Sequence, residues 1–309
     1  MQSTMLAARV YLSTDSPRHA PTGRPRRQRG GMTANPRLIR TAELRDEYWS
    51  RRAIHAAVAD GRLVRLRPGA FVVAGVEPDC IDAGRARGRL TGPTELARRG
   101  VFVLEQGPLH IHVPSTASRF TPPSRPHRIH RRALLRTPHP NALVVEPLDA
   151  LLDAVLAQSP RAALASIDSA LHLGVVRMDD LDELFAALPR RYRRLRRLVD
   201  PRAESGAESL FRLILRAIGC DYDCQVEIPG VGRVDFLVGG WLIIECDSRA
   251  HHADWAAQRN DRRRDLAAAQ RGLVTLRVIA EDVFWRADEV AAAVRGLLRA
   301  RGRAAYMLG

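Results

Sequence analysis

Residues 36–75 show a hydrophobic pattern that changes from helical spacing to strand spacing. The segments TAELRDE and SRRAIHAAVADG predict two helices, the second with Ser50 as its N-cap and Gly61 at its end. LVRLRPGAFVVAG then predicts two strands joined by a Pro-Gly turn. Two helices followed by a hairpin are typical of a winged helix-turn-helix, and we expect that fold over this segment.

Residues 76–201 form a longer and more mixed region. IHVPST predicts a strand, and VVEPLDALLDAVLAQSPRAALASIDSALHLG predicts two helices. The region ends in LPRRYRRLRRLVD, which carries six arginines from Arg190 to Arg197. These arginines fit contact with a phosphate backbone as well as they fit a solvated helix face. The rest of the region contains no constellation of catalytic residues.

Residues 202–309 begin with ESGAESLFRLILRAIG, an amphipathic helix that ends at Gly219. CQVEI, RVDFLV and WLIIECD predict three strands joined by hairpins. A helix over about 253–271, the strand LVTLRVI and the helix DEVAAAVRGLLRARG complete an αβββαβα order. We therefore expect an α/β (α+β) chain whose last part resembles a restriction endonuclease in its element order.

Residues 1–35 lack apolar periodicity and are rich in Pro, Ser, Thr and Arg. They are interpreted either as a disordered basic arm or as the product of a start codon assigned upstream of Met32. Four cysteines are too few for a disulfide scaffold and fit a reducing cytosol. No apolar stretch reaches the roughly 18 residues that a bilayer span needs. We expect a cytoplasmic protein without a membrane partner.

The charged residues exclude some kinds of catalysis and indicate the charge of a binding partner. The 309 residues carry a net charge of +15, and all 49 basic residues are arginine. Without lysine the chain has no Schiff-base amine, no P-loop lysine and no lysine general base. Residues 1–201 hold 33 arginines against 19 acidic residues, whereas residues 202–309 hold 16 against 15. The first two thirds of the chain are therefore expected to attract a polyanion.

The helix and hairpin of the first region supply candidate DNA-binding residues. A buried stripe on the second helix leaves Arg51, Arg52 and His55 displaced toward solvent. Arg65 and Arg67 alternate along the strand before the turn. A winged helix would place these five side chains toward DNA. The alternative is a small helical domain with a solvated arginine face.

Carboxylates gather near the end of the strand WLIIECD. A period of two places Glu245 and Asp247 on one face of this strand, where like charges are costly without a cation. An antiparallel register across the Gly-Gly turn brings Asp235 near Glu245. Hard carboxylate oxygens grouped in this way suit Mg²⁺ or Mn²⁺. Such an ion activates water and stabilises a phosphodiester transition state.

These segments resemble two known families. Residues 37–75, with the segment RRAI..AV..GRLVRLRPGAF, resemble the winged-helix domain of AbiEi antitoxins, and the following region resembles the middle part of such proteins. Asp235 with Glu245-x-Asp247 in the αβββαβ order resembles the PD-(D/E)XK nucleases. VDFLVGGWLIIECDSRAHH and DRRRDLAAAQRGLVTLRV are similar to a bacterial family related to the very-short-patch-repair (Vsr) endonucleases.

The nuclease resemblance implies roles for individual residues. Asp235 and Glu245 would be metal ligands, and Glu208 on the first helix would be a supporting carboxylate. His251 or His252 would donate a proton or orient water near the metal. From the helix that contains DRRRD, Asp261 and Arg264 would orient one another and a phosphate. Four of these residues also have a structural interpretation: a helix-dipole partner for Glu208, a turn residue for His251 and a surface pair for Asp261 and Arg264.

The sequence departs from the nuclease pattern at two positions. The lysine of the superfamily, two residues after the glutamate, is replaced by Asp247, so water activation would fall to the metal, a histidine or an arginine network. Ser248 stands where the nearer family usually has glycine.

The leading hypothesis is a metal-dependent DNA endonuclease or nickase, guided to double-stranded DNA by its N-terminal domain. The alternative is a non-catalytic, antitoxin-type DNA-binding regulator with a degenerate nuclease fold. A nuclease acting on RNA is a third hypothesis. Homodimerisation is left open by the sequence.

Overall fold

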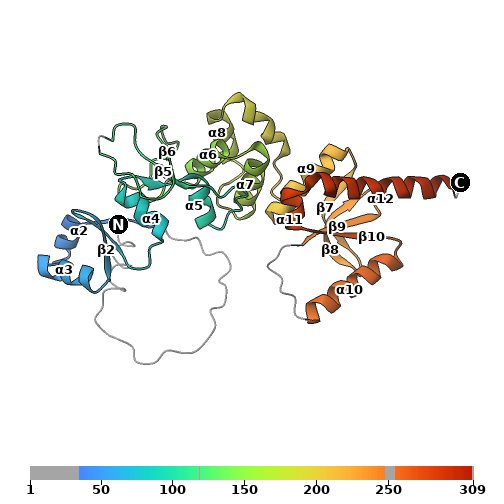
Figure 1. The fold of residues 1–309 in the computed structure, drawn as a ribbon, viewed down its shortest axis with the longest axis horizontal. Helices are drawn as coiled ribbons and strands as arrows, with labels where there is room; N and C mark the ends of the chain where they lie inside the picture. The colour runs from blue at the N-terminus through green and yellow to red at the C-terminus, as the bar shows by residue number, and fades with distance from the viewer. Residues whose placement is uncertain (1–34, 118, 248–254, 308–309) are drawn as a thin grey trace. The chain divides into compact units, whose positions relative to one another are not determined.

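The computed structural model describes residues 35–117, 119–247 and 255–307, which form a mixed α/β protein (Figure 1). The α/β class expected from the sequence is confirmed. The N-terminal segment, interpreted above as an arm or a misassigned start, lies outside the described residues. None of the helices in the described part of the chain combines the length and apolarity needed to cross a bilayer.

The described elements gather into two compact units. The N-terminal unit runs up to Arg99 and includes Gly107–Asp153, and the C-terminal unit consists of Gly100–Gln106 and the chain from Ala154 onward. Each unit is described by itself below.

The N-terminal unit begins with two helices and a three-stranded sheet of order β1-β3-β2. The elements are β1 (Ile39–Arg40), α2 (Thr41–Asp46), α3 (Arg51–Ala59), β2 (Leu63–Arg67) and β3 (Ala70–Val73). The backbone N–H of Ala53 donates to Ser50 Oγ at 3.1 Å, which confirms Ser50 as the N-cap of α3. Leu44, Ile54 and Phe71 lie in a small core between the helices and the sheet.

The remainder of this unit surrounds a second three-stranded sheet of order β4-β5-β6. Its elements are α4 (Pro78–Arg85), β4 (Arg89–Leu90), α5 (Gly92–Arg98), β5 (Leu109–His112), β6 (His127–His130) and the first part of α6 (Pro147–Ala157). The strand expected in IHVPST is β5, which begins and ends earlier than expected. Pro114 lacks the N–H that a longer strand would need.

A buried ion-pair network fixes α6 to this second sheet. Asp153, fully buried, accepts hydrogen bonds from Thr91 Oγ1 at 2.6 Å and Arg132 Nε at 2.7 Å. Asp149, one turn earlier and also fully buried, pairs with Arg132 at 2.8 Å. His130 lies 3.3 Å from Asp153. Each buried carboxylate of this network therefore has a cationic partner.

The C-terminal unit begins with helices that lie upstream of the expected boundary at residue 202. They are α7 (Pro160–His172), α8 (Asp180–Ala187) and the 3₁₀ helix η1 (Arg190–Leu198), and α9 (Gly206–Ile218) follows after that boundary. Asp168 of α7 forms a buried ion pair with Arg212 of α9 at 2.5 Å. Because α7 is held to α9 in this way, the compact unit extends back to Ala154.

The rest of the C-terminal unit is a four-stranded sheet covered by helices on both faces (Figure 1). Its elements are β7 (Tyr222–Ile228), β8 (Gly232–Val238), β9 (Leu242–Asp247), α10 (Trp255–Gln270), β10 (Val274–Ile279), α11 (Ala280–Trp285) and α12 (Ala287–Met307). The strand order is β10-β9-β8-β7, with β10 parallel to β9 and the other pairs antiparallel. The elements follow the order expected from the sequence, with α11 in addition.

Two apolar cores flank this sheet. Phe236 and Ile244 face α9 and the helices after β10, whereas Val234 and Ile243 face Ala268 of α10. Gly219 ends α9 in the left-handed conformation, with φ of 78°, which confirms it as the predicted stop. The central strands β8 and β9 are therefore buried on both faces, and polar residues on them need a specific partner.

Candidate functional site

The hairpin of β8 and β9 brings the two predicted metal ligands together. Phe236 pairs with Ile244, so Asp235 and Glu245 are the next positions along the two antiparallel strands. The backbone N–H of Cys246 donates to Asp235 Oδ2 at 2.8 Å. The proximity expected from the register is therefore confirmed, while the metal-binding role stays a prediction.

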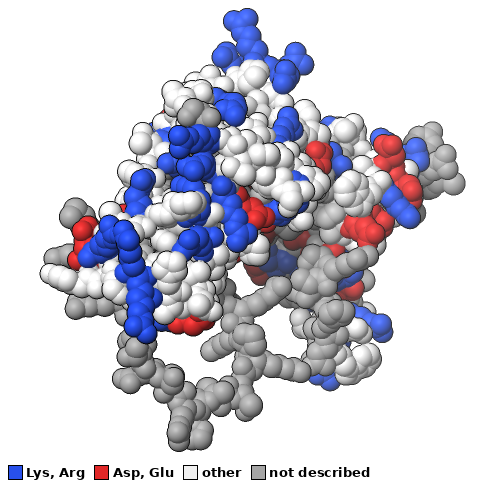
Figure 2. All heavy atoms as spheres, turned by 60° about the vertical axis from the view of Figure 1, so that its left-hand side comes forward, with Lys and Arg blue, Asp and Glu red and all other residues white. Residues whose placement is uncertain are grey.

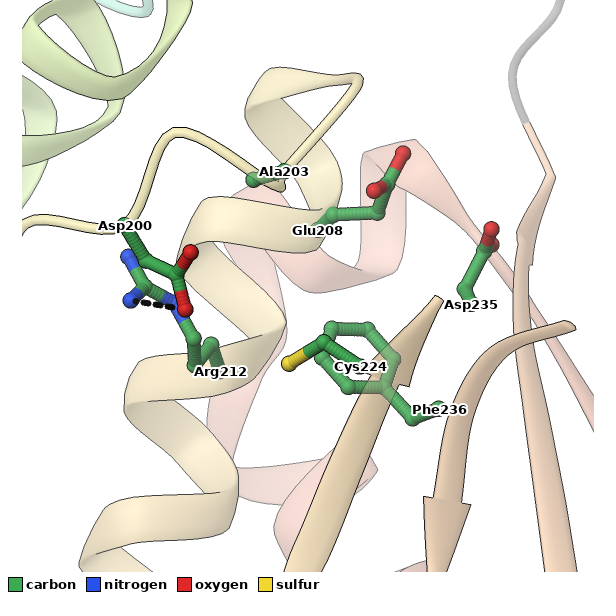
Figure 3. A pocket seen from close by; sticks show the side chains of 7 residues that line it. All are labelled: Asp200, Ala203, Glu208, Arg212, Cys224, Asp235 and Phe236. Atoms are coloured by element: carbon green, nitrogen blue, oxygen red, sulfur yellow. Dashed lines mark ion pairs between the residues drawn. The ribbon is translucent and has the colours of Figure 1, made fainter. Parts of the chain in front are cut away.

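Helix α9 adds Glu208 to the same place. Glu208 is 6% exposed and lies in the first turn, where Ser205 caps the helix. Its Oε2 accepts hydrogen bonds from the Glu204 backbone N–H at 2.9 Å and from Gln225 Nε2 at 2.8 Å. Figure 3 shows the Glu208 and Asp235 side chains at one end of a small pocket.

Gln225 is a site residue that the sequence analysis missed. Its amide lies between the two acids, since Nε2 is 2.8 Å from Glu208 and 3.5 Å from Asp235. Its backbone is left-handed inside strand β7, with φ of 53°. The flanking pairs, Cys224 with Phe236 and Val226 with Val234, place Gln225 opposite Asp235. The PGVG turn in the sequence sets this register, so the position of Gln225 opposite Asp235 could have been predicted from it.

Burial raises the pKa of all three carboxyl groups, and nearby negative charges add to this effect. Burial, and then the charge of Asp235, raise the pKa of Glu245 to about 7, against the opposing effect of Arg264. The same two causes raise the pKa of Glu208. Burial also raises the pKa of Asp235, although the Cys246 N–H partly opposes it. Such a cluster gains from a bound cation.

The side chain of Arg264, on α10, contacts the carboxylate of Glu245. Its Nη2 donates to Glu245 Oε1 at 3.0 Å and to the carbonyl of Arg233 at 2.6 Å, while its Nε donates to the carbonyl of Val231 at 2.9 Å. Asp261, its expected partner one turn away, is 4.0 Å distant. The β8 backbone and the preceding turn therefore orient Arg264 more directly than Asp261 does.

Asp247 is directed to a different partner. It is half exposed at the end of β9 and lies 3.6 Å from Arg277, which also pairs with Asp265 at 2.9 Å. Glu245 and Asp247 thus share a strand end but contact different arginines. The predicted proton donors His251 and His252 lie outside the described residues, as does Ser248.

The donor set fits a magnesium-type ion in part. Nowhere in residues 35–117, 119–247 and 255–307 do three His, Cys, Asp or Glu side chains converge as a metal site made only of protein ligands requires. Mg²⁺, however, commonly uses one or two carboxylates together with water and substrate phosphates. Asp235 and Glu245 supply two such carboxylates with raised pKa values.

The predicted DNA-binding residues of the N-terminal unit fall into two groups. Arg51, Arg52 and His55 are exposed on α3, and Arg65 is exposed on β2 over the ring of Phe71. Figure 2 shows arginine side chains gathered on the face turned toward the viewer, with fewer acidic side chains among them.

Arg67 does not share this exposure. Its Nη1 donates to the carbonyl of Gly84 on α4, and a register shift between Arg65 and Arg67 breaks the expected alternation. Burial, and then the charges of Arg87 and Arg40, lower the pKa of Arg67. Arg67 therefore stabilises the packing of the hairpin on α4.

No protein-family model matches the chain, and no curated protein matches it either. The geometry of the two units is therefore the basis for the function considered next.

Proposed function

We propose that the protein is a Mg²⁺- or Mn²⁺-dependent DNA endonuclease or nickase. The observation that carries this proposal is the cluster of Glu208, Asp235 and Glu245, whose pKa values are all raised. Buried carboxylates whose pKa values are shifted in this way are typical of functional sites. The order α9, three strands, α10, β10, with the acids on the second and third strands, supports a PD-(D/E)XK-like arrangement.

Each residue has a role in this proposal. Asp235 and Glu245 would hold the divalent ion, which would supply a more acidic water and a positive charge facing the phosphodiester. Gln225 links Glu208 to Asp235 and fixes the direction of the Asp235 carboxylate. Arg264, held by two backbone carbonyls, presents a guanidinium to the scissile phosphate.

The absence of the superfamily's lysine changes which groups could transfer a proton. The position two residues after Glu245 holds Asp247, which contacts Arg277. Arginine stays protonated in proteins and does not serve as a general base. Proton transfer would therefore fall to water and to His251 or His252.

Targeting is assigned to the N-terminal unit. The α2, α3 and hairpin segment supports a winged-helix fold in which Arg51, Arg52 and His55 reach into a groove and Arg65 contacts the backbone. Double-stranded DNA is the partner that suits a helix of this kind.

The test is cleavage of supercoiled plasmid by the full chain with Mg²⁺ or Mn²⁺. We expect nicked product from the wild type and a loss of roughly 100-fold or more for Asp235→Asn and Glu245→Gln. Glu289→Gln, an exposed acid on α12, is the matched control and should cleave normally. Equal nicking by wild type and both site variants would overturn the proposal.

A non-catalytic regulator is the second candidate, because Arg264 already pairs with Glu245 at 3.0 Å and a neutralised acid has less need of a metal. This candidate predicts a gel shift on the protein's own promoter without cleavage. Arg51→Ala/Arg52→Ala should abolish the shift, and Arg85→Ala/Arg87→Ala, exposed in the same unit, should not. Replacing the plasmid by RNA tests the RNA-directed alternative.

A further inference from the structure

The 3₁₀ helix η1 presents a basic surface in the C-terminal unit. Tyr192 and Leu195 are buried at 6% and 7% exposure, and they are three residues apart, as one turn of a 3₁₀ helix requires. The side chains on the other two faces are exposed arginines: Arg190, Arg191, Arg193, Arg194, Arg196 and Arg197. We call this set the η1 arginines. The three-residue period arranges them in two columns.

Most of this charge is not neutralised by the residues that the structure describes. Arg196 pairs with Asp182 of α8 at 2.5 Å, and its guanidinium lies over the ring of Phe185. The described part of the chain offers no ion-pair partner to the other five η1 arginines. Because Arg196 reaches the acidic start of α8, the acids lie beside the C-terminal half of η1. Arg190 to Arg194 form its uncompensated half.

η1 is also fixed to the helix that carries Glu208. Directly after η1, the Asp200 backbone N–H donates to Asp168 Oδ1 at 2.8 Å, and its carboxylate lies 3.3 Å from Arg212. Arg212 lies one turn after Glu208 on α9. Figure 3 shows Asp200 and Arg212 lining the same pocket as Glu208 and Asp235. The basic surface and the acidic site therefore belong to one connected structure.

We propose that the η1 arginines bind the sugar-phosphate backbone of double-stranded DNA beside the acidic site. Neighbouring arginines of one column are separated by about 6 Å along the 3₁₀ axis, and phosphates of one strand follow each other every 3.4 Å or so of helix axis. Each step along a column thus corresponds to about two phosphates of one strand, so successive arginines can contact different phosphates. A membrane surface fits less well, because the apolar side of η1 is buried rather than exposed.

The choice of DNA rests on the proposed function, but the test does not require cleavage. Binding of the full chain to a 30-base-pair duplex is measured by fluorescence anisotropy with a chelator, at several salt concentrations. We compare Arg190→Gln/Arg193→Gln with Arg295→Gln/Arg299→Gln, two exposed arginines of α12 in the same unit. Both variants remove two charges, so net charge alone cannot separate them.

The η1 variant should flatten the plot of log affinity against log salt by about 2 units, because each phosphate contact contributes about 0.9. The affinity lost between 50 and 200 mM salt should shrink by about tenfold as a result. Adding Arg191→Gln and Arg194→Gln should double the change in slope. The α12 variant should keep the wild-type slope.

Three outcomes would overturn this proposal. One is a wild-type slope in the η1 variant, and another is an equal change in the α12 variant. The third is loss of binding to phosphatidylserine vesicles with the DNA slope unchanged, which would assign the η1 arginines to lipid. Failure of plasmid nicking leaves this measurement unaffected, so the two proposals fail separately. Unchanged melting temperatures establish that the exposed substitutions preserve the fold.

Discussion

Asp153 of the N-terminal unit and Asp235 of the C-terminal unit are both largely buried carboxylates with hydrogen-bond partners. Burial acts to raise the pKa of Asp153, but His130, Arg132 and Thr91 outweigh it, so the pKa lies below its ordinary value. Burial raises the pKa of Asp235, and its neighbours do not reverse the shift. The same side chain is thus charge-balanced in one unit and unbalanced in the other.

The difference separates a structural network from a candidate site. Arg132 bonds to Asp149 and Asp153 at once, so these acids hold α6 in place. Asp235 is linked to another buried acid, Glu208, by the uncharged amide of Gln225. A fold gains little by holding two acids together in this way. Such a cost is typical of groups retained for a ligand or a reaction.

The largest expected effect concerns the balanced network. Asp153→Asn removes one of the two anions that Arg132 contacts and the anion beside His130, and breaking a buried ion pair costs about 3–5 kcal/mol. Urea unfolding of the full chain should report this loss in the transition of the N-terminal unit. A variant as stable as the wild type would remove the contrast between the two units.

Asp168 provides a second, pH-dependent test. It pairs with Arg212, yet burial raises its pKa to about 6. The folded state therefore holds the proton more tightly than the unfolded state, whose pKa is about 3.9. This contribution to stability is complete below that value and disappears as the pH rises through about 6.

Asp168→Asn removes this titration. Relative to the wild type, the variant should gain about 2 kcal/mol in unfolding free energy between pH 4.5 and pH 7.5. Denaturant titrations at the two pH values measure the difference, with Asp282→Asn on the surface of the same unit as the control. If the variant instead lost stability relative to the wild type over this pH range, the charge of Arg212 would outweigh burial. The pKa of Asp168 would then be lowered, like that of Asp153.

The third prediction concerns the unbalanced site itself. In a chelator, Asp235→Asn should raise the free energy of unfolding, because it removes a carboxylate whose ionisation folding disfavours. Mg²⁺ should raise the melting temperature of the wild type and not that of the variant. If Asp235→Asn were less stable than the wild type in chelator, the charge of the Asp235 carboxylate would be balanced by its neighbours, contrary to this interpretation.

Local patterns explain which features of this comparison the sequence could predict. Ser50 and Gly219 are the predicted caps, since each acts on its own helix end. The meeting of Asp235 and Glu245 follows from a short hairpin, whose turn in the structure has three residues, Gly239 to Trp241. Local patterns do not predict contacts between segments that lie far apart in the sequence.

Three such contacts changed the expectations. The Asp168–Arg212 pair joins residues 44 positions apart and extends the C-terminal unit upstream of residue 202. A bulge turns Arg67 toward α4, which no alternating pattern indicates. The bond from Gln225 to Glu208 depends on a left-handed backbone within a strand, where propensity favours extended conformations.

The smallest predicted effect compares left-handed residues in the two units. Tyr48 has φ of 64° and is 98% exposed, so Tyr48→Gly removes backbone strain without losing a buried contact. The left-handed conformation costs a residue with a side chain about 1–2 kcal/mol, and glycine avoids this cost. Glycine also loses more backbone entropy on folding, which costs about 0.5–1 kcal/mol. The unfolding free energy should therefore rise by about 0.5–1 kcal/mol.

Gln225→Gly relieves similar strain but deletes the amide that donates to buried Glu208, a loss of about 1–3 kcal/mol. The two glycine variants should therefore shift the unfolding free energy in opposite directions, Tyr48→Gly upward and Gln225→Gly downward. Gln225→Gly should also reduce plasmid nicking, because Glu208 and Asp235 lose the group between them. If both variants were stabilised equally, the Gln225 amide would have no part in holding the acids, and its strained backbone would be unrelated to the site.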